Sequence, residues 1–101
     1  MIKLEPEYLN AVKKILAEYI PQLEVRAFGS RVHGENLKQF SDLDLAIMTE
    51  KPLDPFKMID LKEAFSNSNI PIKVDLLDWS EISEEFRKKI LQSFEVIQSK
   101  K

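Results

Sequence analysis

The stretch SDLDLAIM, residues 41–48, limits the possible folds more than any other part of the sequence. Large apolar side chains occupy every second position from its third residue on, and a β-strand turns alternate side chains to opposite faces of its sheet. One face therefore suits a protein core, whereas Asp42 and Asp44 lie together on the other face. The stretch predicts a buried strand over residues 43–48 with two carboxylates at its beginning.

Helical and strand patterns alternate along the rest of the chain. Apolar residues recur at helical spacing in two long segments, and Asp54 followed by a proline is typical of a helix start. We expect helices over residues 6–19, from 30 onward, over 55–67 and over 83–98, and strands over 24–28, 43–48 and 72–77. This order predicts one α/β (α+β) domain over residues 1–101, with helices packed on a small mixed β-sheet.

The composition excludes several classes of protein. The chain has no cysteine and one histidine, which rules out disulfides, thiolate zinc sites and any site that needs two imidazoles. Its 15 basic and 17 acidic side chains lack the basic excess of a sequence-independent nucleic-acid binder, so we expect no direct contact with nucleic acid. Because we find neither a membrane-spanning apolar run nor a signal-peptide pattern, we expect a cytoplasmic protein without membrane contact.

Gly29 stands where a predicted strand gives way to a predicted helix. A glycine lets the main chain turn sharply and lets a ligand approach it, and a helix N-terminus offers N–H groups to a phosphate. Ser30 adds a hydroxyl and Arg31 a planar cation. These three residues are therefore candidate phosphate ligands. The alternative is an ordinary turn that caps a helix.

The aspartates at the start of the predicted strand suggest a cation site. Asp42 and Asp44 would repel each other by about 4 kcal/mol at 4 Å and an effective dielectric of 20, and a cation between them would relieve this repulsion. Ligands that are all oxygens favour Mg²⁺ or Mn²⁺. The alternative is a solvated turn that enters a strand.

Asp75 is a third acidic residue, and it stands inside another apolar strand, where an unpaired carboxylate is costly to bury. It either pairs with a lysine such as Lys73 or joins Asp42 and Asp44 at a metal. A phosphate turn, a same-face aspartate pair and a later strand aspartate together favour metal-assisted phosphoryl or nucleotidyl transfer.

The motifs Gly29-Ser30, Asp42-Leu43-Asp44 and Asp75 resemble the active-site pattern of the DNA polymerase beta-like nucleotidyltransferase superfamily. Within it, the chain is most similar to the minimal nucleotidyltransferases, which are commonly antitoxins of HEPN-domain ribonuclease toxins. A loop insertion around residues 36–40 would lengthen the connection between the first two motifs.

The resemblance implies a polymerase beta-like fold, ATP as the substrate and two Mg²⁺ ions, with Mn²⁺ as a substitute. It assigns the phosphates to Gly29, Ser30 and Arg31, and it assigns the metal ions and catalysis to Asp42, Asp44 and Asp75. The acceptor would be a tyrosine of a HEPN-type ribonuclease encoded alongside, which the attached AMP silences.

Two other functions remain open from the sequence. The chain could be a binding module that masks its partner by contact, in a homo- or hetero-oligomer. It could also transfer a nucleotide to a small molecule such as an aminoglycoside, although 101 residues leave little room for an acceptor-binding domain.

Overall fold

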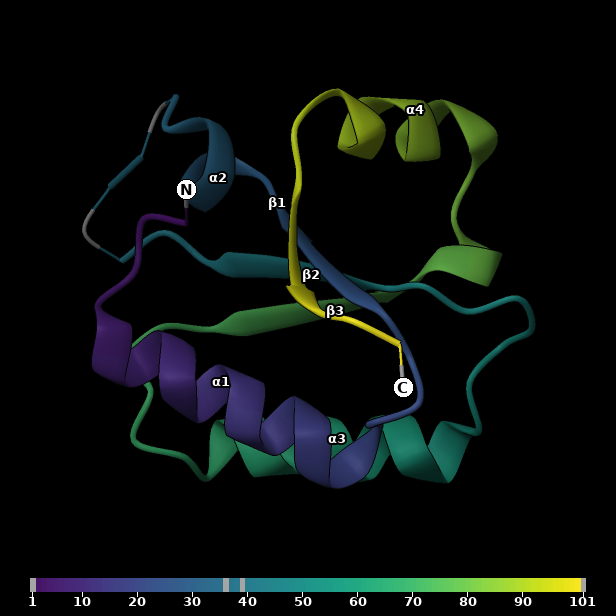
Figure 1. Ribbon diagram of the computed structural model, residues 1–101, viewed down its shortest axis with the longest axis horizontal. Coiled ribbons are helices and arrows are strands. Elements are labelled where there is room, and N and C mark those ends of the chain that lie inside the picture. Colours follow the sequence, from purple (N-terminus) through teal and green to yellow (C-terminus); the bar gives the residue numbers. More distant parts are fainter. Residues whose placement is uncertain (1, 36, 39, 101) are drawn as a thin grey trace.

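The computed structural model describes residues 2–35, 37–38 and 40–100, so Met1, Asn36, Gln39 and Lys101 are not described. Two positions of the expected loop insertion, 36 and 39, lie outside the described residues. The elements follow one another as α1 (Pro6–Tyr19), β1 (Val25–Phe28), α2 (Ser30–His33), β2 (Leu43–Ile47), α3 (Pro55–Ser66), β3 (Val74–Asp78), the 3₁₀ turn η1 (Trp79–Glu81), α4 (Glu84–Gln92) and β4 (Glu95–Gln98) (Figure 1).

The four strands form one sheet in the order β3-β2-β1-β4. Strand β1 is antiparallel to both of its neighbours, whereas β2 and β3 are parallel and α3 connects them. The sheet is therefore mixed, and the expected α/β architecture is confirmed.

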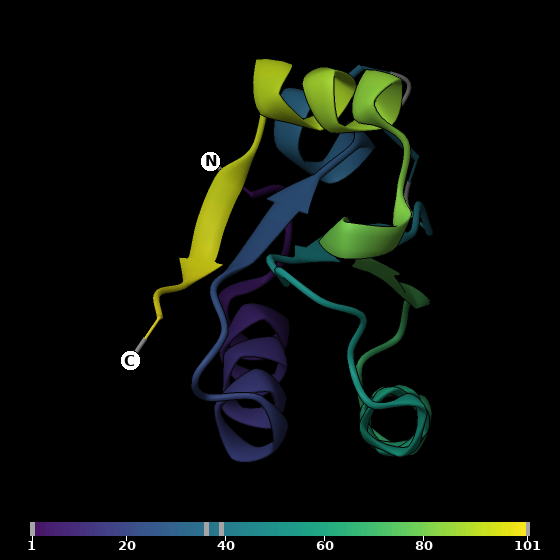
Figure 2. The ribbon, with the colours of Figure 1, turned by 90° about the vertical axis from the view of Figure 1, so that its right-hand side faces the viewer.

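Helices cover the sheet on both faces (Figure 2). On one face α1 and α3 enclose the main core, in which Leu16, Leu45 and Leu61 are fully buried. On the other face α4 packs over a smaller cluster of Phe28, Ala46 and Ile90. Among the described residues, no helix has the length and apolar character to cross a membrane. Since β2 buries its alternate side chains in the larger core, its remaining side chains, including Asp44, lie on the α4 side.

Local sequence signals fix several element boundaries. Asp54 caps α3 by accepting a hydrogen bond from the Phe56 N–H at 2.9 Å, as expected. Ser83 caps α4 in the same way, accepting from the Phe86 N–H. The strand expected over 72–77 is found at Val74–Asp78, and the helix expected from residue 30 has a single turn.

The prediction of a helix over residues 83–98 is wrong for the last third of that segment. Helix α4 ends at Gln92, because Ser93 adopts an extended conformation (φ −158°, ψ 105°), and the chain returns as β4. Here the sheet offers a free edge of β1, and pairing with it satisfies the main chain. Phe94 lies under the Arg26 guanidinium at 4.5 Å from the ring centre, and Ile97 enters the main core. Tertiary pairing therefore overrides the helical stripe of apolar residues.

Candidate functional site

Two of the predicted aspartates face each other across neighbouring strands. Asp44 of β2 is in register with Asp75 of β3, and on its other side it is in register with Phe28 of β1. Residues that are paired across strands point to the same face, so both carboxylates emerge on the α4 side of the sheet. Asp42 lies two positions before Asp44, just outside β2. The fold thus brings Asp44 and Asp75 together, as predicted.

The charge state of Asp44 reflects this crowding. Burial first, then the negative charges of Asp75 and Asp42, raise the pKa of the Asp44 carboxyl from 3.8 to about 6. Like charges disfavour each other's ionised form, and burial removes the water that would stabilise it. A cation or a hydrogen-bond donor placed among the three groups would stabilise the ionised carboxylates.

Gly29 is pressed against Asp44. Its backbone has φ +81° and ψ −163°, a region that is essentially restricted to glycine. A Cβ atom at this position would overlap the Asp44 Oδ2 atom. The glycine is therefore needed twice, for its backbone conformation and for the close approach of the turn to the carboxylate.

The turn after Gly29 is short. Its carbonyl oxygen accepts from the N–H groups of Val32 and His33 at 2.9 and 3.1 Å, and the single turn ends at Gly34 in the left-handed conformation. One helical turn has too small a dipole to attract a phosphate strongly, so the phosphate contact predicted for Ser30 rests on its hydroxyl and the local main chain.

Arg31 is buried, with 7% of its surface exposed. Its Nε donates to the Ser41 carbonyl at 2.8 Å and its Nη1 to the Lys3 carbonyl at 2.6 Å. The Lys3 N–H in turn donates to the Arg31 carbonyl at 2.6 Å. The guanidinium braces the N-terminal segment and the residue that precedes Asp42. The phosphate contact of Arg31 stays a prediction. The hydrogen bonds of its guanidinium to the Ser41 and Lys3 carbonyls were not predicted from the sequence.

Asp75 pairs with Lys73, which is one of the two alternatives that the sequence left open, and the metal alternative stays a prediction. Lys73 Nζ lies 3.3 Å from its Oδ1, and the Lys73 side chain is 72% exposed. An ion pair this exposed contributes little, between zero and about 1 kcal/mol. The same carboxylate is close enough to Asp44 to raise its pKa. Lys73 therefore leaves Asp75 available to a stronger cation.

The aspartates of the candidate site are candidate ligands of a divalent cation. Within residues 2–35, 37–38 and 40–100, no group of three His, Cys, Asp or Glu side chains is arranged to hold a metal ion. Carboxylates are nevertheless ligands that Mg²⁺ prefers, and proteins usually hold Mg²⁺ through one or two carboxylates together with the phosphates of a substrate. The pair Asp44–Asp75, with Asp42 nearby, fits an ion that arrives with a nucleotide.

A hollow of about 610 Å³ adjoins the Gly29 turn, between α2 and α4. Its lining includes Gly29 itself together with His33, Phe86, Lys89 and Gln92. An aromatic ring and two potential cations beside the turn are suited to a nucleotide, so Lys89 and His33 are additional candidate ligands. The sequence did not identify them, since Lys89 lies in a charged run typical of a solvated helix face.

The chain matches the family "Polymerase beta, Nucleotidyltransferase" over residues 10–101. It belongs to that family. This nucleotidyltransferase is 50% identical over 99 residues to "Probable protein adenylyltransferase MntA" of Haemophilus influenzae, an alignment that covers 98% of this chain and 86% of the relative. A relative from Methanocaldococcus jannaschii, described as a putative protein adenylyltransferase, is 34% identical over 86 residues, or 85% of this chain and 86% of the relative.

Solved structures share the fold of this nucleotidyltransferase. A toxin–antitoxin structure with AMP-PNP superimposes with a TM-score of 0.73 at 23% identity, over 92% of this chain and 74% of that one. A tri-AMPylated Shewanella oneidensis HEPN toxin in complex with its MNT antitoxin gives a TM-score of 0.68 at 21% identity, over 95% and 73% of the two chains. The expected polymerase beta-like fold is confirmed, and the family match together with the 50% identical relative confirms the assignment as a nucleotidyltransferase enzyme.

Proposed function

We propose that this nucleotidyltransferase is a Mg²⁺-dependent protein adenylyltransferase that moves AMP from ATP to a tyrosine of a cytoplasmic HEPN-type ribonuclease and thereby acts as its antitoxin. The observation that carries the proposal is the contact of Gly29 with Asp44, beside Asp75 on the next strand. Support for a protein acceptor comes from the relative that is 50% identical and described as a protein adenylyltransferase.

The residues divide the reaction between them. Gly29 and Ser30 would bind the phosphates, and Asp42 and Asp44 would hold Mg²⁺, which would supply positive charge to neutralise the triphosphate. Asp75, on the edge strand, would be a further ligand and would orient the acceptor hydroxyl. The hydroxyl oxygen bonds to the α-phosphorus and its proton passes to water, while the bond from the α-phosphorus to the oxygen of the leaving pyrophosphate breaks. A raised pKa of the Asp44 carboxyl is suited to a group that ionises fully when the metal and nucleotide bind.

The attached nucleotide would silence a ribonuclease by two physical effects. AMP adds bulk beside the site, and its phosphate adds negative charge where the phosphates of RNA must dock. Repulsion and steric exclusion then weaken RNA binding without unfolding the partner.

Masking by contact is the second candidate function, and one observation favours it. Large apolar side chains are exposed on α3, with Phe56 at 77% and Ile59 at 52%. Apolar surface of this kind often marks an interface.

A double variant separates the two functions. Asp42→Asn with Asp44→Asn removes two metal ligands, while Asp60→Asn with Glu63→Gln removes two exposed charges of α3 as a matched control. Each protein is mixed with the HEPN-type partner, ATP and Mg²⁺, and intact mass and ribonuclease activity are measured. We expect AMP transfer and silencing with wild type and control, and neither with the site variant. Full silencing by a folded site variant without any mass change would establish masking instead.

A further inference from the structure

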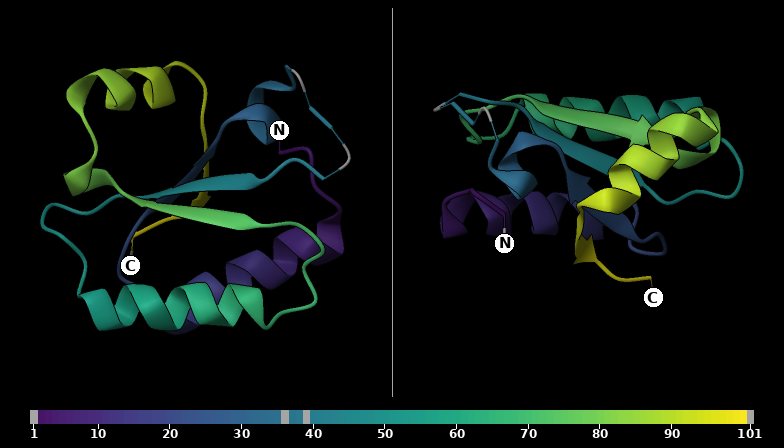
Figure 3. Two further views of the ribbon diagram at one scale, coloured as in Figure 1. Left: turned by 180° about the vertical axis from the view of Figure 1, so that it is seen from behind. Right: turned by 90° about the horizontal axis from the view of Figure 1, so that it is seen from above.

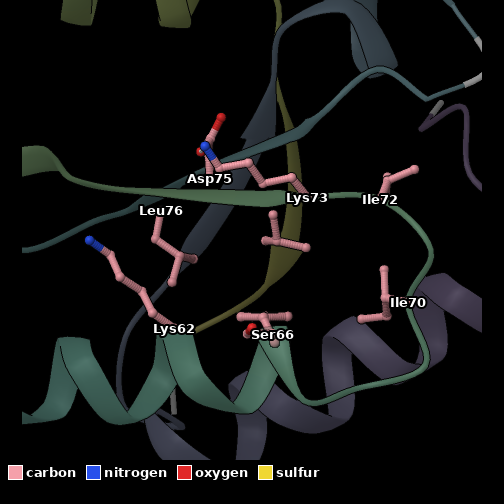
Figure 4. A pocket seen from close by; sticks show the side chains of 9 residues that line it. Lys62, Ser66, Ile70, Ile72, Lys73, Asp75 and Leu76 are labelled. Carbon is pink, nitrogen blue, oxygen red and sulfur yellow. Dashed lines mark ion pairs between the residues drawn. The ribbon is translucent and has the colours of Figure 1, made fainter.

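A groove runs between α3 and the edge strand β3, with a volume of about 530 Å³ (Figure 4). Apolar side chains such as Phe65, Ile70 and Leu76 line it, and Lys62 and Lys73 add two cations. Asp75 belongs to the groove and to the candidate active site alike. In the close view Leu76 points toward α3, whereas Lys73 and Asp75 extend from the opposite side of β3.

The outer edge of β3 is open in the part of the chain that the structure describes. This strand is the first in the sheet order, and the view from above shows it on the outer side of β2 (Figure 3). The Lys73 carbonyl accepts from the Leu43 N–H of β2 at 2.9 Å. Because alternate residues of a strand direct their N–H and C=O groups to opposite sides, Val74 and Leu76 present theirs outward.

A segment that paired with this edge as an additional strand would contact both the groove and the candidate active site. Its alternate side chains would enter the groove toward α3, and the others would lie on the face that carries Asp44 and Asp75. A hydroxyl-bearing residue of the second set would then stand beside Asp75, while its two sequence neighbours would enter the apolar groove.

We propose that the acceptor protein docks an extended segment on the outer edge of β3, with its hydroxyl-bearing residue beside Asp75 and apolar neighbours in the groove. This inference rests on the proposed transfer to a protein and adds how the acceptor is held. Lys62 and Lys73 select a segment with acidic residues near the acceptor position, because opposite charges steer and orient association. The continuity of the groove with the active site through Asp75 favours the acceptor over any other occupant.

Amide hydrogen exchange tests the docking directly. The full chain is saturated with AMP-PNP and Mg²⁺, the HEPN-type partner is added, and exchange is measured residue by residue. We expect the Val74 and Leu76 amides, which face outward, to become at least tenfold slower. The amides of Asp75 and Leu77 face β2 and should change little. A similar slowing without the partner that grows with protein concentration would show that a second copy occupies the edge, and it would overturn the proposal.

Two variants test the groove by kinetics. Lys62→Glu reverses an exposed charge of the groove, and we expect it to raise the KM for the partner about fivefold without changing kcat or the affinity for AMP-PNP. Lys57→Glu makes the same charge change on α3 outside the groove lining and is the matched control. Val74→Pro removes one outward N–H without touching the β2 ladder, and it should raise the same KM.

The outcomes separate this inference from the proposed function. If AMP is transferred while the Val74 and Leu76 amides remain unprotected and Lys62→Glu has the wild-type KM, the proposal of docking on β3 is wrong and the proposed AMP transfer is supported. If the two amides are protected but wild type adds no mass to the partner, the docking stands and the transfer is wrong. If the two amides stay unprotected and no AMP is transferred, both the docking and the proposed function are overturned.

Discussion

Replacing Gly29 by alanine should damage stability and activity together, because this residue serves the fold and the site at once. Its φ of +81° and ψ of −163° cost a residue with a side chain about 1–3 kcal/mol. The new Cβ would also overlap Asp44 Oδ2, and driving that side chain off its rotamer costs about 1 kcal/mol more. The free energy of unfolding should fall by about 2–4 kcal/mol, which lowers the melting temperature of a domain this size by roughly 10–25 °C.

Gly34 provides the matched control. It also has a positive φ, +80°, but the nearest atom to the place that a Cβ would take is the end of the flexible Lys3 side chain, at 3.9 Å. Gly34→Ala should therefore cost about 1–2 kcal/mol of backbone strain alone. It should leave Asp44 in place and the rate of AMP transfer nearly unchanged.

Thermal unfolding and transfer rates of the two variants measure this coupling of stability and activity. With Asp44 displaced, Gly29→Ala should lose at least 100-fold in transfer rate, since a catalytic group misplaced by about 1 Å costs roughly that factor. Combining it with Asp44→Ala should relieve the overlap and recover about 1 kcal/mol of stability, but not the strain. The coupling would be refuted if Gly29→Ala had the same melting temperature as Gly34→Ala and transferred AMP at the wild-type rate.

Three further outcomes are expected. Ser30→Ala should lower ATP affinity in calorimetry while changing stability by no more than about 1 kcal/mol, whereas unchanged affinity would leave Ser30 as an ordinary turn residue. Asp75→Asn should leave ligand-free stability unchanged or higher, because the Lys73 pair is exposed, and it should abolish the rise in melting temperature caused by Mg²⁺ and ATP; a large ligand-free loss would contradict this. Burial alone would raise the pKa of the Asp78 carboxyl, but the hydrogen bonds it accepts, first of all from the Leu53 N–H, outweigh burial and lower this pKa below 3.8. The ionised carboxylate should therefore stabilise the fold at neutral pH, and this stabilisation should be lost as the pH falls through the folded pKa. Denaturant unfolding should show Asp78→Asn as less stable than wild type at pH 7, with a gap that closes in acid, and a gap independent of pH would contradict the assignment.

The placement of the aspartates could be predicted because it follows from a two-residue period. Once residues 43–47 form a buried strand, Asp44 must leave the core, and the same holds for Asp75 between Val74 and Leu76. The parallel register that pairs Asp44 with Asp75 was not readable from either strand alone. It depends on how α3, which packs against α1, returns the chain to the sheet.

The end of the chain was predicted wrongly for a complementary reason. Phe86, Ile90, Phe94 and Ile97 fit a helical stripe, and nothing local to them marks Ser93 as a break. The free edge of β1 decides the outcome, since it offers hydrogen bonds that a longer helix would leave without partners. An edge belongs to the whole sheet and cannot be inferred from the segment that will cover it.

Arg31 shows how far a motif can suggest a role without fixing the contacts. An arginine after a Gly-Ser turn suits a phosphate, yet its side chain donates to the carbonyls of Ser41 and Lys3. Those bonds join residues that are 10 and 28 positions away, distances over which sequence patterns carry no signal. Because Ser41 directly precedes Asp42, the buried guanidinium determines where the loop places the first aspartate. The chemistry of the site and the stability of the N-terminal segment are thereby coupled through one side chain.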